Sequence, residues 1–423
     1  MHIGVYGSGY LGTVVSACLA DFGNPVTCYD ADSVRVYATA QGTIPYYEKN
    51  LKDVIRRNVR AGRLVYSTDL DSFAQKTQVI YVAEDSARYI EDIAVKIARS
   101  ANPSGILVVI TPVPVGTATR LEQRLASIEK PMTLVSHPIF LTDGCAVEDF
   151  NWPDRILLGT RSSEAVQVLK QIYRPLAMRG VPVIVTSHET AELAREAATA
   201  FVATKISFIN ELAALCEHVS ADAVDLALAL GLDKKIAPRC LQPGAGFGGS
   251  FVESDMDALA QLAQGQGISL KVLSAAREVN RSLTERIVDK LNVVMQSLNN
   301  KEVGLLGLAF KPNTNSVAAS SAINLAKSLM TKGARVRAYD PVAIPDARAE
   351  LEKMPVRYCD SAYHAAEGSD ALVVGTGWPE FRALDFERIK RLLRRPVIVD
   401  TKNLLDGTRM RAIGFQYVGM GRN

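Results

Sequence analysis

Short apolar runs alternate with segments of helical periodicity over residues 1–187, and this alternation predicts strands separated by helices. Seven of the runs are rich in β-branched residues and have the length of buried strands. They are HIGVY, PVTCYD, QVIYVA, GILVVI, MTLVS, RILLG and VPVIVT. Because such alternation builds parallel sheets covered by helices, residues 1–187 are expected to form an α/β domain.

The pattern changes over residues 188–299, where helical periodicity continues without strand-like runs. An alanine-rich amphipathic segment over 190–218 contains no glycine or proline and predicts one long helix. Further helices are expected over 221–230, 256–264 and 269–297. This middle part of the chain is therefore predicted to be an all-α domain.

The α/β pattern returns over residues 300–423, and its beginning repeats the beginning of the chain. EVGLLGLAF resembles HIGVYGSGY, and ARVRAYDPV resembles PVTCYDADS. The runs ALVVGT and PVIVDT predict two more strands. Internal duplication of a nucleotide-binding unit explains the repeat, and chance similarity of two short segments explains it equally well.

Composition narrows the class of protein. Hydrophobic residues make up 48% of the chain, charged residues 22%, and the net charge is +3, as in ordinary globular proteins. We expect no nucleic-acid partner, because the sequence has no basic stripe with interleaved aromatic residues. No run of about 18 apolar residues predicts a membrane span. The six cysteines form no CxxC pair, which indicates reduced thiols in the cytoplasm and no metal site.

The segment GSGYLG follows the first predicted strand and opens a helix, which is the setting of a dinucleotide fingerprint. Its glycines, Gly7, Gly9 and Gly12, allow a tight turn and close approach of a pyrophosphate, with Tyr10 and Leu11 between them. Asp30 ends the second strand about 20 residues further on, as the fingerprint requires. An acid there accepts from a ribose 2′-hydroxyl and repels a 2′-phosphate, so NAD is favoured over NADP. A glycine turn needed only for packing is the alternative.

A second glycine-rich segment, PGAGFGGSFVESD, covers residues 243–255 and has four glycines within six residues. Such a bare backbone indicates a close approach, or turns where a Cβ would clash. The loop ends on a large aromatic side chain, Phe251.

These segments occur in a set whose order and spacing resemble the UDP-glucose/GDP-mannose dehydrogenase family over nearly the whole chain. The matching pieces are GSGYLG, GTIPYYEKNL, VPVGT, SHPIFLTDGCAVEDFNWPDRILLG, FVATKISFINELA, PGAGFGGS, GLAFKPNT, YDP and WPEFRALDF. The resemblance implies two Rossmann-like domains, an NAD-binding one over 1–187 and a UDP-binding one over 300–423. A central helical domain over 188–299 would join them, and its long helix would form a homodimer.

Members of this family oxidise the C6 alcohol of a nucleotide sugar to a carboxylate with two NAD. The first step needs a base, and the second forms a thiohemiacetal on a cysteine. A lysine and an asparagine stabilise negative charge that develops on oxygen. By the same resemblance, the second glycine-rich loop approaches the substrate.

This sequence departs from the family at the reacting groups. Phe251 stands at the cysteine position and Ile139 at the glutamate position, whereas Asp255 is retained. The other differing positions are Arg195 for the catalytic lysine, Thr199 for the asparagine, Ser254 for the loop lysine and Pro112 for a threonine. A phenyl ring forms no thiohemiacetal and isoleucine carries no proton, so the usual oxidation is predicted to be lost or strongly impaired. Cys240 and Cys145 are candidates for a substitute thiol, and packing residues otherwise.

The cofactor side differs as well. Glu84 and Asp85 replace a Val-Gly pair that faces the cofactor in the family, and Ala318 replaces an arginine near the nicotinamide. Two carboxylates near a pyrophosphate oppose its binding, so NAD is expected to bind weakly.

The substrate side is better preserved by the resemblance. Lys235 and Lys402 stand where the family has two arginines. A lysine keeps the positive charge but loses the bidentate geometry of an arginine. The predicted substrate-binding residues are Phe140, Leu141, Asp143, Lys235, Phe247, Gly248, Gly249, Ser250, Phe310, Lys311 and Lys402.

The sequence therefore predicts a family member that binds a nucleotide sugar, a UDP-sugar in the first place, without the usual chemistry. One alternative is an active NAD-dependent UDP-glucose 6-dehydrogenase that makes UDP-glucuronate by a variant route. Another is a non-catalytic or regulatory partner in polysaccharide precursor synthesis, which forms mixed dimers with an active relative.

Overall fold

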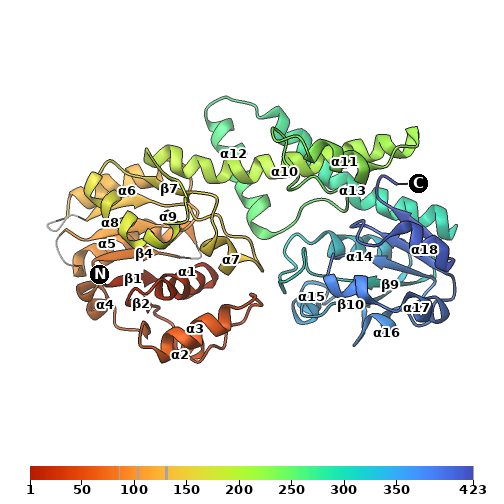
Figure 1. Cartoon of the computed structure of the whole chain (residues 1–423), viewed down its shortest axis with the longest axis horizontal. Helices are drawn as coiled ribbons and strands as arrows, with labels where there is room; N and C mark the ends of the chain where they lie inside the picture. Colours follow the sequence, from red (N-terminus) through yellow and green to blue (C-terminus); the bar gives the residue numbers. More distant parts are fainter. Residues whose placement is uncertain (85, 102–103, 129–131, 423) are drawn as a thin grey trace. The chain divides into compact units, whose positions relative to one another are not determined.

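The computed structural model describes residues 1–84, 86–101, 104–128 and 132–422, which fold into two compact units, Met1–Ala197 and Ala198–Asn423 (Figure 1). The boundary between the units falls inside the long helix α10 (His188–Val219). The predicted division into three domains stays a prediction.

The first unit is built on an eight-stranded sheet of order β3-β2-β1-β4-β5-β6-β7-β8. Its strands are β1 (Ile3–Tyr6), β2 (Val26–Tyr29), β3 (Leu64–Ser67), β4 (Val79–Val82), β5 (Ile106–Val109), β6 (Thr133–Ser136), β7 (Ile156–Gly159) and β8 (Val183–Thr186). All seven predicted strands are present, and β3 was not predicted. The pairs are parallel except β6 with β7, which is antiparallel at Ser136 and Gly159, so the expected parallel sheet has one reversed junction.

Helices cover both faces of this sheet and bury two separate cores. The helices are α1 (Tyr10–Asp21), α2 (Ser33–Ala40), α3 (Leu51–Arg60), α4 (Leu70–Lys76), η1 (Ala87–Tyr89), α5 (Ile90–Ser100), α6 (Thr117–Ala126), α7 (Ala146–Asn151), α8 (Ser163–Ile172) and α9 (Arg174–Ala177). Helices α1, α3, α7 and α8 contribute to one core, and α4, α5 and α6 to the other. This doubly wound arrangement brings the carboxyl ends of β1 and β2 to the edge where ligands bind in such folds.

Four predicted helices of the middle region are present with small shifts in their ends. They are α10, α11 (Ala223–Gly231), α12 (Ser250–Gly265) and α13 (Lys271–Met295). Helix α12 begins six residues before the predicted start, directly after the glycine-rich loop. Apolar residues of α10, α12 and α13 pack around Phe247 and Met256, so the loop enters a hydrophobic cluster.

The second unit also contains a six-stranded parallel sheet, of order β11-β10-β9-β12-β13-β14. Its strands are β9 (Glu302–Leu306), β10 (Arg335–Tyr339), β11 (Arg357–Tyr358), β12 (Ala371–Val374), β13 (Val397–Asp400) and β14 (Gln416–Gly419). Its helices are α14 (Ser321–Thr331), α15 (Ile344–Glu350), α16 (Ala362–Ala366), η2 (Pro379–Ala383), α17 (Phe386–Leu392) and α18 (Gly407–Ile413). Two Rossmann-like sheets and a long central helix confirm the predicted fold class.

The two sheets begin with the same hydrogen bonds. The amide of Gly7 donates to Tyr29 O at 2.8 Å, and that of Gly307 donates to Tyr339 O at 2.7 Å. The next amide in each turn donates to the aspartate after the second strand, Ser8 N to Asp30 Oδ2 and Leu308 N to Asp340 Oδ2. The repeat in the sequence therefore coincides with the same local hydrogen bonds in both sheets.

Helix α10 is the one helix of the described residues that is long and apolar enough to cross a membrane, with a mean hydropathy of 1.3 over its most apolar window. This is weak evidence, because core helices of globular folds meet the same criteria. Part of that window is buried in the fold.

Candidate functional site

The turn between β1 and α1 has the geometry of an anion site. Gly7 has a φ of +96°, and a Cβ there would lie 2.5 Å from Ala83 O. A Cβ on Gly12 would collide with Gly7 O. Helix α1 is capped by Gly9, which supplies no side chain to its first amides. Among the described residues Gly9 gives these amides no side-chain cap, so this turn fits the pyrophosphate of a dinucleotide.

Asp30 directly follows β2 beside this turn and is held as a carboxylate. Its Oδ2 accepts from the amide of Ser8 at 2.8 Å and from the Ser8 hydroxyl at 2.7 Å. Burial raises its pKa, but hydrogen bonds from the amides of Asp32 and Ser8 outweigh burial, so the pKa lies below its ordinary value. An ionised acceptor at this position suits a ribose hydroxyl.

Of the two carboxylates predicted to oppose NAD binding, Glu84 and Asp85, only Glu84 lies in the described ranges. The amide of Glu84 lies 3.7 Å from the place where a Cβ on Gly7 would stand, so the backbone of Glu84 borders the turn. Thr111 Oγ1 donates to Glu84 O at 3.0 Å. Burial, with smaller contributions from Tyr29, Glu84 and Asp30, raises the pKa of Tyr6 to about 12. Asp85 lies outside the described residues, and weak NAD binding stays a prediction.

Glu48 is a buried acid that the sequence analysis missed. Its Oε2 accepts from the Tyr10 hydroxyl and from Gly144 N, both at 2.6 Å, and its Oε1 accepts from Ala146 N at 3.0 Å. It therefore connects helix α1 to the segment that contains the predicted substrate residues Leu141 and Asp143. A lone glutamate within the apolar and aromatic run IPYYEKNL was the available signal.

The glycines of the second loop are explained by packing inside the second unit. A Cβ on Gly244 would lie 2.7 Å from Thr401 O, and one on Gly249 would lie 3.0 Å from the Phe310 ring. Cβ atoms on Gly246 and Gly248 would collide with the side chain of Asn280 and with the carbonyl oxygen of Ala319, respectively. The loop thus lies against α13 and against the loops after β9 and β13.

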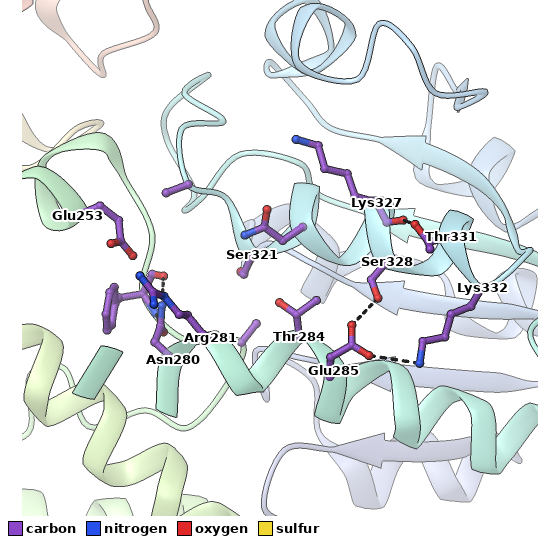
Figure 2. Close-up of a pocket in the computed structure, with 14 residues that line it drawn as sticks. Glu253, Asn280, Arg281, Thr284, Glu285, Ser321, Lys327, Ser328, Thr331 and Lys332 are labelled. Atoms are coloured by element: carbon purple, nitrogen blue, oxygen red, sulfur yellow. Dashed lines mark hydrogen bonds and ion pairs between the residues drawn. The ribbon is translucent and has the colours of Figure 1, made fainter. Parts of the chain in front are cut away.

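Asn280 holds the loop from α13. Phe247 N donates to Asn280 Oδ1 at 2.9 Å, and Asn280 Nδ2 donates to Phe247 O at 3.2 Å. A cavity of about 500 Å³ lies beside these residues, between α13 and α14 (Figure 2). Figure 2 shows Glu285 of α13 joined to Ser328 of α14 and to Lys332, which directly follows α14, at the lining of this cavity.

Phe251, which the sequence resemblance puts at the family nucleophile position, lies in the first turn of α12. Phe251 is 43% exposed there, and its carbonyl oxygen accepts from Ser254 Oγ at 3.1 Å. One turn later Asp255 is buried, and its Oδ2 accepts from Thr199 Oγ1 of α10 at 2.9 Å. Ile139, at the position of the family base, packs against the core of the first sheet. Phe251 supplies no thiol, and Ile139 supplies no proton acceptor.

The cysteines divide by burial. Burial raises the pKa of Cys18, and it raises the pKa of Cys28 to about 12, so both are inert thiols. Cys145 is half-buried beside α7, and Cys240 is exposed in the loop before the glycine-rich segment. None of the six cysteines, all of which lie in the described ranges, forms a disulfide.

Two of the predicted substrate-binding lysines lie in loops of the second sheet. Lys402 follows β13, and its Nζ donates to Ser321 Oγ at 3.4 Å. Lys311 is half-buried next to Phe310, with its Nζ 5.8 Å from the Phe310 ring. Gln242 Nε2 donates to Lys402 O at 3.3 Å, which ties the start of the glycine-rich loop to the Lys402 loop.

The remaining predicted residues belong to both units, and each is described within its own unit. Lys235 is exposed after α11, where its amide donates to Asp233 Oδ1 at 2.9 Å. Phe140 lies under the Arg155 guanidinium, whose carbon is 3.8 Å from the ring centroid. The side chain of Ser250 is outside the described part of the structure. Among the described residues no group of three His, Cys, Asp or Glu could hold a metal ion.

Comparison with known proteins gives matches along the chain. The NAD binding domain of the UDP-glucose/GDP-mannose dehydrogenase family matches residues 1–177, its central domain 189–282 and its UDP binding domain 304–407. UDP-glucose 6-dehydrogenase TuaD of Bacillus subtilis (strain 168) is 38% identical over 99% of this chain and 93% of its own length. UDP-glucose 6-dehydrogenase of Rhizobium meliloti (strain 1021) is 37% identical over the full length of both chains.

The solved structure of a UDP-glucose dehydrogenase from the archaeon Pyrobaculum islandicum has a similar fold. Its TM-score is 0.89 at 29% identity, over 100% of this chain and 98% of that one. The matching NAD binding domain makes NAD the expected cofactor, in agreement with the turn at Gly7 and the acid at Asp30. The chain belongs to the UDP-glucose/GDP-mannose dehydrogenase family.

Proposed function

We propose that this protein binds a UDP-sugar and NAD without carrying out the thiol-dependent four-electron oxidation. The observation that carries the proposal is Phe251 in the first turn of α12, where an exposed phenyl ring occupies the nucleophile position. The neighbouring acid Asp255 is bound to Thr199. A hydride transfer from an alcohol also requires a base, and Ile139 accepts no proton.

The proposed ligand is a UDP-sugar of the UDP-glucose type. The matching UDP binding domain and the names of the relatives support this choice. Lys311 and Lys402 would hold the diphosphate, since both are cations in loops of the second sheet. The sugar would lie against the glycine-rich loop near Gly248 and Gly249.

The test combines an assay with a binding measurement. Purified protein, freed of host dehydrogenases, is incubated with UDP-glucose and NAD while NADH and UDP-glucuronate are measured. Calorimetry then gives the affinities for UDP-glucose, UDP-glucuronate and GDP-mannose. We expect UDP-sugar binding and no UDP-glucuronate. Enzyme-dependent glucuronate formation would refute the loss of oxidation, and absence of binding at millimolar UDP-sugar would refute the retained site.

An active enzyme with a displaced thiol is the second candidate, and the exposure of Cys240 favours it over the buried cysteines. If UDP-glucuronate does form, Cys240→Ala and Cys145→Ala variants identify the thiol. Activity that survives both substitutions would exclude either thiol as the nucleophile.

We also propose a homodimer through α10 and a cytoplasmic location. Phe201, Phe208 and Leu215 recur every seven residues on α10 and are 67%, 52% and 55% exposed. An apolar stripe of this kind is covered in most proteins by another chain. The absence of disulfides among the six cysteines, all of them in the described ranges, supports a reducing compartment. Light scattering of the parent and of Phe208→Glu tests the dimer, and co-purification with an active relative tests the mixed-dimer alternative.

A further inference from the structure

Glu48 joins two segments that lie far apart in the sequence. Tyr10, the residue after the second fingerprint glycine, donates its hydroxyl to Glu48 Oε2. The amide of Gly144 donates to the same oxygen, and the amide of Ala146 donates to Oε1. One carboxylate therefore binds the first residue of α1 and the N-terminal amides of α7.

The position of this carboxylate depends on both segments. Glu48 is 5% exposed, and a buried charge is stable only where hydrogen bonds replace its water. Burial, followed by the bond to Glu48, raises the pKa of Tyr10, so its hydroxyl stays protonated and remains a donor. Because Tyr10 and Gly144 share one oxygen, displacement of either changes the bond of the other.

The two segments joined by Glu48 belong to two different proposed sites, one for the dinucleotide and one for the sugar. Tyr10 begins the helix whose uncapped amides fit the dinucleotide pyrophosphate. Residues 140–146 include the predicted substrate residues Phe140, Leu141 and Asp143. This segment has its own support, because Thr142 N donates to Asp149 Oδ2 at 2.8 Å.

We propose that the shared Glu48 carboxylate couples the dinucleotide site to the sugar site, so that binding of NAD orders residues 142–146 and tightens UDP-sugar binding. This inference rests on the proposed function, which supplies the second ligand. A ligand that orders a shared element reduces the ordering cost for the next ligand, which gives positive cooperativity. By linkage, the UDP-sugar tightens NAD binding by the same factor.

The experiment measures a coupling factor, the ratio of the UDP-glucose Kd without NAD to that with saturating NAD. We expect about fivefold or more for the parent, at the lower end of common allosteric couplings. Tyr10→Phe removes only the hydroxyl that reaches Glu48 and should bring the factor close to one. Tyr66→Phe, which removes a buried hydroxyl from β3 of the same unit, is the matched control and should keep the parent factor.

A second measurement needs no variant. Hydrogen exchange of peptides that contain Gly144 and Ala146 should slow when NAD is added without UDP-sugar, because both amides bind Glu48. Glu48→Gln carries one oxygen acceptor in place of two and should lose this protection. If the hydrogen bond between Tyr10 and Glu48 is purely structural, Tyr10→Phe should have a lower melting temperature than the parent and the same coupling factor.

The outcomes separate this inference from the proposed function. A parent that binds no UDP-glucose refutes both. A parent that binds UDP-glucose with a factor near one, or a Tyr10→Phe variant with the parent factor, overturns the coupling alone. Unchanged exchange at Gly144 and Ala146 on addition of NAD also overturns it.

Discussion

Lys402 Nζ lies 3.4 Å from Ser321 Oγ, so the loop after β13 meets the first residue of α14. Burial lowers the pKa of Lys402 to about 8, and the Asp400 carboxylate opposes this shift only in part. An arginine at the same place would stay charged at every physiological pH. The family arginine and this lysine therefore differ in titration as well as in shape.

UDP-glucose affinity should fall as the pH rises through about 8. A phosphate binds the protonated amine, and protonation is complete only well below the folded-state pKa of Lys402. We expect a constant Kd between pH 6 and 7, and a weakening of about fivefold or more by pH 9. Calorimetry between pH 6 and 9 measures the Kd for UDP-glucose. Lys402→Arg is the control and should bind independently of pH, so equal profiles for parent and variant would exclude Lys402 as the anchor.

The same group makes a second, smaller prediction for stability. Because the unfolded lysine titrates near 10.5 and the folded one near 8, the unfolded state binds more protons between these values. The contribution of Lys402 to the free energy of unfolding therefore rises with pH from about 8 to 10.5. Urea titrations of the parent and of Lys402→Met should differ in this window, and parallel curves would contradict the depressed pKa.

Gly248→Ala should destabilise the second unit. The new Cβ collides with the carbonyl oxygen of Ala319 and lies 3.3 Å from Phe310 Cβ. Overpacking of this kind costs about 1–3 kcal/mol. Urea unfolding measures the loss. Gly265→Ala is the matched control, since nothing lies within 4 Å of its added methyl group, and it should be neutral or slightly stabilising. Equal stability of the two variants would remove the packing explanation of the loop.

Phe251→Cys alone should not restore UDP-glucuronate formation. The thiol would stand on α12 without a base, because Ile139 is apolar, and without the family lysine and asparagine, which are Arg195 and Thr199. Turnover should require Ile139→Glu, Arg195→Lys, Thr199→Asn and Ser254→Lys in addition. NADH formation under anaerobic conditions measures the turnover of UDP-glucose by each variant. Steady turnover by Phe251→Cys alone would show that a group other than residue 139 acts as the base.

Glu84→Gln should tighten NAD binding by about 1 kcal/mol, roughly fivefold in Kd. The backbone of Glu84 borders the turn at Gly7, and its charge contributes to the raised pKa of Tyr6. The gain should shrink in high salt, because exposed charges are screened. Glu164→Gln on α8 is the control, and equal NAD affinity of parent and Glu84→Gln would mean that this carboxylate points away from the cofactor.

Local sequence was sufficient for most of the secondary structure and for one functional turn. All seven strands predicted in the first unit are present, because short β-branched runs between turn residues have one stable backbone conformation. Strands β3, β11 and β14 were missed: β11 has only two residues, and β3 has only one fully buried residue. The turn at Gly7 and the acid at Asp30 were found because their spacing is contained within one βαβ unit.

The predicted loss of the reacting groups rests on the sequence alone, because thiol and carboxylate chemistry depends on residue type. Phe251 and Ile139 lack the required atoms in any fold. The direction of β7 and β8 was not evident, since a strand has the same hydrophobic pattern whichever way it runs. Only long-range pairing decides that direction.

The partners of individual atoms were decided by the tertiary structure alone. The four glycines predicted that other atoms approach the loop closely, but they did not predict which ones. The atoms belong to residues from distant segments, namely Thr401, Asn280, Ala319 and Phe310. The sequence analysis did not distinguish Glu48 from the other acids, and only the folded chain brings Tyr10 and Gly144 to its Oε2. Glycine spacing describes backbone freedom within a few residues, whereas the atom that fills the space depends on contacts across more than 30 positions. For that physical reason the loop and the Glu48 connection required the folded chain.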